Sequence, residues 1–388
     1  MDILELVPVF KDVFGEEAEA AFFAPGRVNL IGEHLDYNGG HVFPCALTLG
    51  TYGLLRRRSD QTVRCYSKNF PAAGVKTFSL SDNRYQEGLG WANVVLGLLV
   101  CLPEVEGELT GFDLFIWGNL PHQAGLSSSA ALELLVGTAL NETFHLGLDR
   151  LALVKLGQRV ENHFLGVNSG IMDQFAVAFG QKDQALYLDT ASLAYELVPT
   201  HFAPYRLLIM DSHKQRELAQ SAYNDRREEC EGALKALQEV VDIDHLCELT
   251  PSEFREHQAV IPTGVMRQRA RHVVMEEART QEAKKALVAG DLARFGELLN
   301  ESHISLRDDY DITGPELDCL VDEAQRHFGV LGARMTGAGM GGCALALIHE
   351  DDIPEVTADV RAAFVAKFDR EPSFYIAEVG AGARALPL

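Results

Sequence analysis

The chain has 388 residues, of which 47% are hydrophobic and 23% charged, so it is long enough for two globular domains with ordinary apolar cores. Its formal net charge of −22 argues against nucleic acid or an anionic membrane as a partner, because both select for basic surfaces. The acidic balance does not exclude ATP, since phosphate sites are built locally from backbone N–H groups and a metal ion.

Three features indicate a cytoplasmic protein. The seven cysteines are an odd number without a C-x-x-C pair, which is typical of reduced thiols rather than of disulfides or a zinc site. The N-terminal run MDILELVPVF contains acidic residues and no basic segment, unlike a signal peptide. The longest apolar run, residues 94–102, stops at Pro103 and is too short to span a bilayer.

The predicted elements alternate in an α+β order along the chain. Residues 151–164 carry apolar side chains at the spacing of one buried helix face, and residues 214–241 are helical in character and rich in charge. Strand-like runs occur at 41–49, 62–66, 111–117, 186–189 and 206–211.

The chain shows neither an internal repeat nor a low-complexity linker. Its composition changes near residue 200. We expect a first domain at 1–180, which carries the candidate motifs, and a second at 181–388. A return of the last residues to the first domain is kept as an option.

The first candidate motif is GRVNLIGEHLDYNGG, residues 26–40. It gathers Arg27, Glu33, His34 and Asp36 between glycines, a mixture of hydrogen-bonding groups that is rare in a surface loop. Histidines such as His34 are more often structural than metal ligands, so we do not predict a metal site on this evidence.

The second motif lies in GNLPHQAGLSSSAALELLVGTAL, residues 118–140, where Gly125 and three serines precede an apolar helix. The first turn of a helix presents unpaired N–H groups, so this loop could hold an anion, and serine hydroxyls could bind Mg²⁺. The competing interpretation is that residues 127–129 only cap the helix, and this stretch taken alone favours capping.

The third motif is TGAGMGGC, residues 336–343. Gly337, Gly339 and Gly342 fit the G-x-G-x-x-G pattern of dinucleotide-binding folds, but residues 344–348 read as a strand and not as a helix. We therefore predict a turn between two strands. Its glycines either allow positive φ or let the backbone approach a ligand or a neighbouring loop closely.

Several other enzyme classes are excluded by missing motifs. A Gly-Lys dipeptide is absent from the sequence, which excludes a Walker A loop, and the H-R-D and D-F-G motifs of protein kinases are also missing. The G-x-S-x-G nucleophile elbow and the H-E-x-x-H zinc helix are missing as well.

Taken in order, the three motifs resemble those of the GHMP small-molecule kinases, and residues 26–40 are similar to the signature of galactokinases. NSGIMDQ at 168–174 and YNDRREEC at 223–230 are further matches, so the resemblance extends from Ala24 to Gly342. It implies an α+β fold of two GHMP kinase domains with the active site in the cleft between them. It also implies transfer of the ATP γ-phosphate, with Mg²⁺, to the anomeric hydroxyl of galactose, a step of galactose metabolism.

The resemblance also implies roles for individual residues. The expected catalytic pair is Arg27 and Asp173. The expected sugar-binding residues are Glu33, His34, Asp36, Gly170, Asp173 and Tyr223. The expected ATP-binding residues are Ser67, Gln123, Ala124, Gly125, Leu126, Ser127, Ser128 and Ser129. The expected Mg²⁺ ligands are Ser129 and Glu161.

General chemistry agrees with these roles. A hexose presents several hydroxyls, and convergent carboxylates bind them through charge-assisted hydrogen bonds. An arginine near the transferred phosphoryl group stabilises the charge of the transition state. Beside Asp173 it would also favour the ionised carboxylate, which could then accept the proton of the sugar hydroxyl.

Four positions need separate comment. Gln123 stands where the family commonly has glycine in its second motif, which could restrict the loop or add an amide contact. Ala338 and Met340 stand where the third motif often has glycine and phenylalanine, and we still expect that turn to form. Trp91 matches an aromatic position near the adenine, although it could equally belong to the core.

Two alternative functions stay open. One is an N-acetylgalactosamine kinase, which needs room at the 2-position of the sugar. The other is a galactose sensor that keeps the fold without turnover, but the intact residues 127–131 and the presence of both Arg27 and Asp173 favour an enzyme. We expect a monomer.

Overall fold

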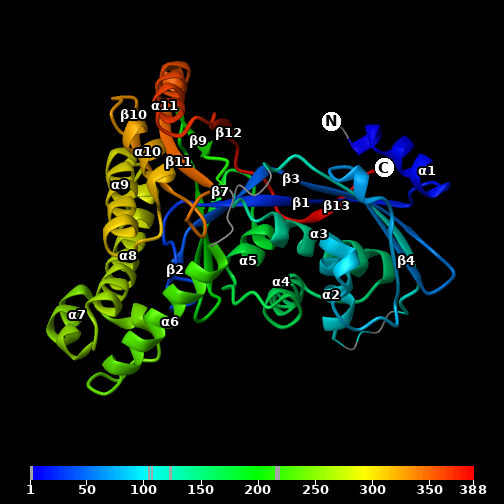
Figure 1. The fold of residues 1–388 in the computed structure, drawn as a ribbon, viewed down its shortest axis with the longest axis horizontal. Coiled ribbons are helices and arrows are strands. Elements are labelled where there is room, and N and C mark those ends of the chain that lie inside the picture. Colours follow the sequence, from blue (N-terminus) through cyan, green and yellow to red (C-terminus); the bar gives the residue numbers. More distant parts are fainter. Residues whose placement is uncertain (1–2, 104, 106–107, 122–124, 215–218) are drawn as a thin grey trace.

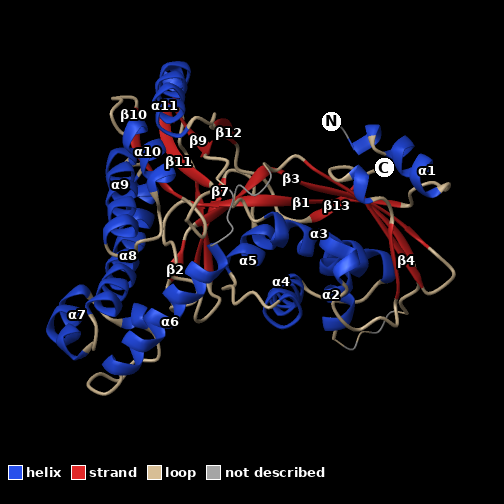
Figure 2. Ribbon diagram, in the orientation of Figure 1, coloured by secondary structure: helices blue, strands red, loops and turns tan. Residues whose placement is uncertain are grey.

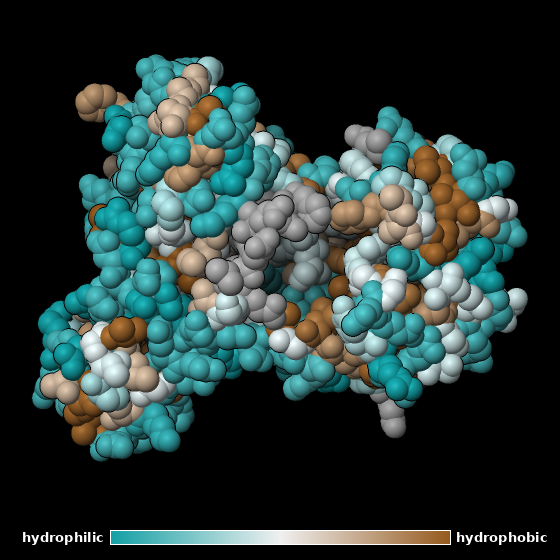
Figure 3. Space-filling model, viewed as in Figure 1, coloured by the Kyte–Doolittle hydropathy of each residue, from teal (hydrophilic) through white to brown (hydrophobic). Residues whose placement is uncertain are grey.

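The computed structural model describes residues 3–103, 105, 108–121, 125–214 and 219–388, with α-helices and three sheets (Figure 1). Gln123 and Ala124, two of the predicted ATP-binding residues, lie outside this part. Among the described residues, no helix combines the length and apolarity needed to cross a membrane. The face shown in Figure 3 is mostly hydrophilic, with apolar side chains in small separate groups, as the net charge of −22 leads one to expect.

The largest sheet has six strands in the order β13-β1-β3-β6-β4-β5. All neighbours are antiparallel except β4 and β6. The strands are β1 (Ala20–Asn29), β3 (Pro44–Arg57), β4 (Thr62–Ser67), β5 (Lys76–Ser79), β6 (Phe112–Gly118) and β13 (Arg384–Leu386).

Helices cover both faces of this sheet (Figure 2). Alternation along β3 explains the two layers: Gly53 faces Leu135 of a helix on one side, whereas Leu54 packs with Phe10 and Phe14 of α1 on the other. The helices are α1 (Val7–Phe14) on the second face and α2 (Asn93–Cys101), α3 (Ser128–Phe144), α4 (Arg150–Arg159) and α5 (Met172–Phe179) on the first.

The second large sheet has the order β10-β11-β9-β12 and is antiparallel throughout. One face packs on α9 through residues such as Phe295 and Leu298, and the other packs on α10 and α11. The elements are β9 (Tyr205–Asp211), β10 (Val330–Met335), β11 (Cys343–His349), β12 (Ser373–Ala377), α8 (Gly264–Ala289), α9 (Leu292–Asp308), α10 (Pro315–Ala324) and α11 (Ile353–Phe368).

The remaining elements connect these parts. A three-stranded sheet joins β2 (His41–Val42), β7 (Gln184–Asp189) and β8 (Tyr195–Pro199), and two more helices are α6 (Ala219–Leu237) and α7 (Pro251–His257). The short helices are η1 (Ile3–Glu5), η2 (Pro71–Ala73), η3 (Glu87–Ala92), the π-helical η4 (Val160–Leu165), η5 (Leu246–Glu248), η6 (Gln258–Val260) and η7 (Glu350–Asp352).

The five predicted strands are confirmed, with shifts of a few residues, as is the helix within 214–241. The predicted strand at 41–49 is two strands, because residues 41–42 pair with β7 whereas the chain from Pro44 to Arg57 pairs with β1. The predicted helix at 151–164 ends as an α-helix at Arg159 and continues as the π-helical turn η4. The turn predicted at 336–343 does connect two strands, β10 and β11, the second of which begins at Cys343.

Candidate active site

A cavity of about 240 Å³ collects most of the predicted sugar-binding and catalytic residues. Its wall includes the end of β1, the loop after it, the start of α5, helix α6 and the glycine-rich turn after β10. It is lined by Arg27, His34, Asp36, Glu161, Val167, Ser169, Gly170, Met172, Asp173, Tyr223, Gly337 and Ala338.

Arg27 and Asp173 form an ion pair in this cavity. The Arg27 Nε donates to Asp173 Oδ1 at 2.8 Å, and Nη2 lies 2.7 Å from the same oxygen. Arg27 Nη1 donates to the Gly125 carbonyl at 2.8 Å, and Ser127 Oγ donates to Asp173 Oδ2 at 2.5 Å. Arg27 is 4% exposed, so the pair fixes the carboxylate against a largely buried cation.

The loop that follows β1 carries His34 into the cavity, where the His34 backbone has φ of 64°. His34 Nδ1 lies 2.9 Å from the Tyr37 hydroxyl, which is 2.7 Å from the Tyr310 hydroxyl. Burial, and then the charge of His272, lowers the pKa of His34 to about 3, so the ring is neutral near pH 7. Its Nε2 has no hydrogen-bond partner in the described part of the chain and is available to a ligand.

Asp36 faces the cavity beside Gly170. Burial, and then the negative charge of Asp173, raises the pKa of Asp36 to about 7. A Cβ at position 170 would overlap the Asp36 carboxylate, so only glycine permits this approach. The ring of Tyr223 lies 5.6 Å from that of His34 and closes this side of the cavity.

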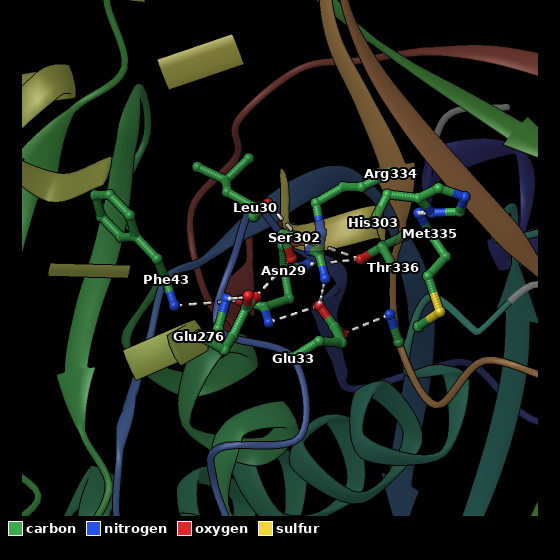
Figure 4. Close-up of polar contacts among 12 residues, drawn as sticks. Asn29, Leu30, Glu33, Phe43, Glu276, Ser302, His303, Arg334, Met335 and Thr336 are labelled. Carbon is green, nitrogen blue, oxygen red and sulfur yellow. Dashed lines mark hydrogen bonds and ion pairs between the residues drawn. The ribbon is translucent and has the colours of Figure 1, made fainter. Parts of the chain in front are cut away.

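Glu33 occupies a different place from the other predicted sugar residues. It is 1% exposed and is not among the residues that line the cavity. Its Oε1 accepts from the Gly337 N–H at 2.6 Å, and Oε2 accepts from Asn29 Nδ2 at 2.8 Å and lies 2.8 Å from Arg334 Nη2 (Figure 4). The contacts seen for Glu33 are therefore with the protein, and its contact with a sugar stays a prediction.

A second cavity, of about 380 Å³, contains further predicted ATP-binding residues. Trp91 lines this cavity and is partly buried, packed against the hydrophobic core. Its position therefore allows both a contact with adenine and a packing role. Leu126 instead points inward, and its carbonyl accepts from the Arg27 N–H at 3.1 Å. The cavity is lined by Thr51, Ser67, Asn69, Phe70, Trp91, Val94, Ile116, Gly118, Leu120, Pro121, Ser128, Ser129 and Leu132.

The hydroxyls of Ser127, the residue before α3, and of Ser129, in its first turn, do not cap this helix. Ser127 is the N-cap residue in a left-handed conformation, with φ of 59°, and makes no side-chain cap bond. Its hydroxyl bonds to Asp173 instead, and that of Ser129 donates to Glu161 Oε1 at 2.5 Å. The capping interpretation, which the stretch alone favoured, is wrong for these two hydroxyls.

The surroundings of Ser129 and Glu161 suit a hard cation. Glu161 lies in the π-helical turn, and such turns often occur at functional sites. Glu133 is buried nearby, and burial followed by the charge of Glu161 raises the pKa of Glu133 well above its usual range. Together with Asp173, these carboxylates repel one another, and a divalent ion bound to oxygen ligands would relieve that repulsion.

The glycine-rich turn adopts the positive φ angles that its sequence led us to expect. Gly337 has φ of 83° and Met340 φ of 56°. A Cβ on Gly337 would lie 2.9 Å from the Gly125 carbonyl, so this turn packs directly on the serine loop. Both functions considered for the glycines, positive φ and close approach, are therefore present.

Several residues at the site were not predicted. Helix α8 contacts the loop after β1, which carries the predicted sugar-binding residues within 33–36 (the sugar loop). Glu276 Oε1 accepts from the Gly32 N–H at 3.1 Å, and His272 Nε2 lies 3.2 Å from the Glu33 carbonyl. Arg334 was missed too, although a charged residue inside the apolar strand VLGARM is a visible signal. Glu276 has no such signal, because it lies in a highly charged helix.

Three family models match the chain: the galactokinase galactose-binding signature over residues 8–57, the GHMP kinases N-terminal domain over 93–181, and the GHMP kinases C-terminal model over 283–366. The chain is 50% identical over 387 residues to a galactokinase of Streptococcus suis (strain 05ZYH33), with 100% of this chain and 99% of that protein covered. A galactokinase of Enterococcus faecalis (strain ATCC 700802 / V583) is 50% identical over 378 residues, covering 97% and 98%.

Solved structures agree with the sequence matches. The structure of Lactococcus lactis galactokinase complexed with galactose is 48% identical, with a TM-score of 0.96 and coverage of 99% of this chain and 100% of that one. Methanococcus jannaschii mevalonate kinase has a TM-score of 0.63 at 18% identity, covering 92% and 98%, and shares the fold alone.

Proposed function

The chain belongs to the galactokinase family of GHMP kinases, and on that premise we propose which of its residues bind galactose and which perform the transfer. The activity of the family is ATP-dependent phosphorylation of galactose at its anomeric hydroxyl, which gives galactose 1-phosphate and ADP. The alternatives, an N-acetylgalactosamine kinase and a sensor without turnover, are not favoured by full-length relatives named galactokinase.

Galactose binds in the 240 Å³ cavity in this proposal. The unpartnered His34 Nε2 and the Asp36 carboxylate take sugar hydroxyls, and the Gly170 backbone and Tyr223 form the second wall. Glu33, which lies behind the cavity wall, completes the proposed set. A site that pairs particular hydroxyls rejects an epimer, because buried groups are left unpaired.

The Arg27–Asp173 ion pair is the observation that carries the catalytic assignment. Asp173 accepts the proton of the anomeric hydroxyl as the sugar oxygen attacks the γ-phosphorus of ATP, and the bond from that phosphorus to the β,γ-bridging oxygen breaks. Arg27 then faces the charge that develops on the transferred group and stabilises it. Ser127 orients Asp173 through its 2.5 Å hydrogen bond.

ATP binds beside this pair. Its phosphates lie along the loop that contains Gln123, Ala124, Gly125, Leu126 and the three serines 127–129. Its base lies in the 380 Å³ cavity near Ser67 and Trp91. Ser129 and Glu161 would hold Mg²⁺, which would neutralise charge on the ATP phosphates.

The wider assignments are also proposals. We place the domain boundary between residues 180 and 181, assign the protein to the cytoplasm, and expect it to act as a monomer with galactose and ATP as its small-molecule partners.

One assay tests the function directly. ADP release is measured with galactose, glucose, N-acetylgalactosamine and arabinose at equal concentration. We expect galactose to be used at least about a hundredfold better than glucose, since unpaired buried groups discriminate strongly against an epimer. Equal use of galactose and glucose would contradict the assigned sugar site, and a preference for N-acetylgalactosamine would support that alternative.

A further inference from the structure

We infer that Arg334 is a positioning residue for the reaction, which holds the sugar loop and the glycine-rich turn in the arrangement that galactose requires. The inference rests on the proposed function, because it takes the 240 Å³ cavity as the galactose site. Arg334 itself is fully buried and does not line that cavity.

The side chain of Arg334 reaches from β10 to the loop that follows β1 (Figure 4). Its Nη1 donates to the carbonyls of Asn29 and Leu30, both at 3.1 Å. Its Nη2 lies 2.8 Å from Oε2 of Glu33, the residue directly before His34 in the chain. One guanidinium group therefore contacts the beginning and the middle of the loop that presents His34 and Asp36.

Thr336, the residue directly after β10, makes a second connection to Asn29, the last residue of β1. The Thr336 Oγ1 donates to the Asn29 carbonyl at 3.0 Å and accepts from the Asn29 N–H at 3.1 Å. The Asn29 side chain in turn donates to Glu33 Oε2 and accepts from the Phe43 N–H at 3.2 Å. These contacts involve the backbone or short side chains, which have little freedom to adjust. We therefore expect that a shift of Arg334 would move the loop after β1 as a unit.

The contacts continue from Glu33 to the catalytic pair. Glu33 Oε1 accepts from the Gly337 N–H, and Gly337 packs on the Gly125 carbonyl. That carbonyl accepts from Arg27 Nη1, and Arg27 pairs with Asp173. Arg334 thus sits at the start of a continuous series of contacts that ends at the proposed catalytic base.

Stability alone is a poor explanation for this arginine. Within the described part of the chain, Arg334 Nη2 pairs with the buried Glu33 carboxylate at 2.8 Å, and Arg334 Nε has no hydrogen-bond partner. Buried donors without partners are costly, and buried ion pairs are often replaced by apolar residues without loss of stability. A positional role explains why a charge is nevertheless present here.

The test compares Arg334→Met, Arg334→Lys and the double variant Arg334→Met/Glu33→Gln with the wild type. Each is assayed for melting temperature, galactose affinity by calorimetry, kcat, and KM for galactose and ATP. Arg334→Met should lower kcat/KM for galactose about a hundredfold, the usual effect of a misplacement of about 1 Å, and change KM for ATP less than about threefold. Arg334→Lys should recover part of this loss because it keeps the charge.

The double variant separates position from stability. It removes the unpaired buried carboxylate, so its melting temperature should exceed that of Arg334→Met. Because Glu33 is itself a proposed sugar residue, the galactose affinity of the double variant is compared with that of Glu33→Gln alone and should be lower. Recovery of both stability and galactose affinity in the double variant would overturn the inference. So would an Arg334→Met enzyme that melts earlier but keeps the wild-type galactose affinity.

Two controls complete the design. Arg269 is a buried arginine that also pairs with a glutamate and donates to a carbonyl, Asp309 O at 2.6 Å, so Arg269→Met should reduce stability without changing galactose affinity. Asp36→Ala tests the site itself. If Asp36→Ala keeps full galactose affinity, the proposed site is wrong; if it loses affinity while the Arg334 variants keep theirs, only the inference on Arg334 fails.

Discussion

Replacement of Asp173 by asparagine is the sharpest test of the proposed chemistry, because the change keeps the shape of the side chain. The amide oxygen can still accept from Arg27, and the amide N–H₂ can donate to the Ser127 hydroxyl, which accepts as well as donates. What disappears is the charge and the basic oxygen.

The expected loss is large. A positioned general base contributes about 10²–10⁴ in rate, which corresponds to about 3–5 kcal/mol of activation free energy. Arg27 also loses its counter-charge at 4% exposure, so we expect a loss of about 1–3 kcal/mol in the free energy of unfolding. Galactose affinity should change less than turnover, since the hydrogen bonds persist.

The assay measures ADP release at saturating galactose and ATP, with circular dichroism to establish folding and calorimetry for galactose binding. Asp149→Asn is the matched control. Asp149 caps α4, accepting from the Ala152 N–H at 2.7 Å, and asparagine caps equally well, so its turnover should be unchanged. Asp173 makes no such cap bond in α5. A folded Asp173→Asn enzyme with near wild-type turnover would refute the assignment of the base.

Three further predictions concern the surroundings of this pair. Ser129→Ala and Glu161→Gln should each raise the Mg²⁺ concentration needed for half-maximal activity while leaving galactose affinity unchanged; a normal Mg²⁺ titration in both would contradict the metal assignment. Gly170→Ala should raise KM for galactose at least about tenfold, because the new Cβ overlaps the Asp36 carboxylate, and an unchanged KM would argue against that contact. Burial raises the pKa of Asp36 from 3.8 to about 7, so the folded protein binds that proton more tightly than the unfolded chain, and the free energy of unfolding should fall as pH rises from about 4 to about 7. Melting curves across this range should show a smaller fall in Asp36→Asn, and identical slopes would contradict the raised pKa.

Apolar periodicity predicted the fold elements well because most of them bury one face. The strand at 206–211 and the α-helix that begins the predicted helix at 151–164 follow directly from such patterns. The π-helical turn at Val160–Leu165 could not be predicted, since it continues the same apolar stripe and differs only in its hydrogen bonds.

The site was predicted from motifs, and its supporting contacts were not. Arg27 and His34 were identified because their mixture of hydrogen-bonding groups is rare in a surface loop, and Asp173 was assigned from the resemblance to the family. The partner of Glu33, in contrast, is Arg334, about 300 residues later, and nothing local to either residue indicates the pair. Ser127 shows the same limit of local sequence. The preference of serine for helix N-termini predicted that its hydroxyl caps α3, but the hydroxyl instead donates to Asp173.

The pairing of β13 with β1 has a consequence for how this protein is made. Ala21, Phe22 and Phe23 lie opposite Leu386, Ala385 and Arg384, so one edge of β1 lacks its partner until about 360 residues after it have been synthesised. At bacterial or eukaryotic translation rates this takes about 20–70 s. During that time the edge is an open template for pairing with another chain. The sheet that carries Arg27 can therefore be completed only after translation has passed residue 386, and that interval is when the nascent protein is most exposed to aggregation.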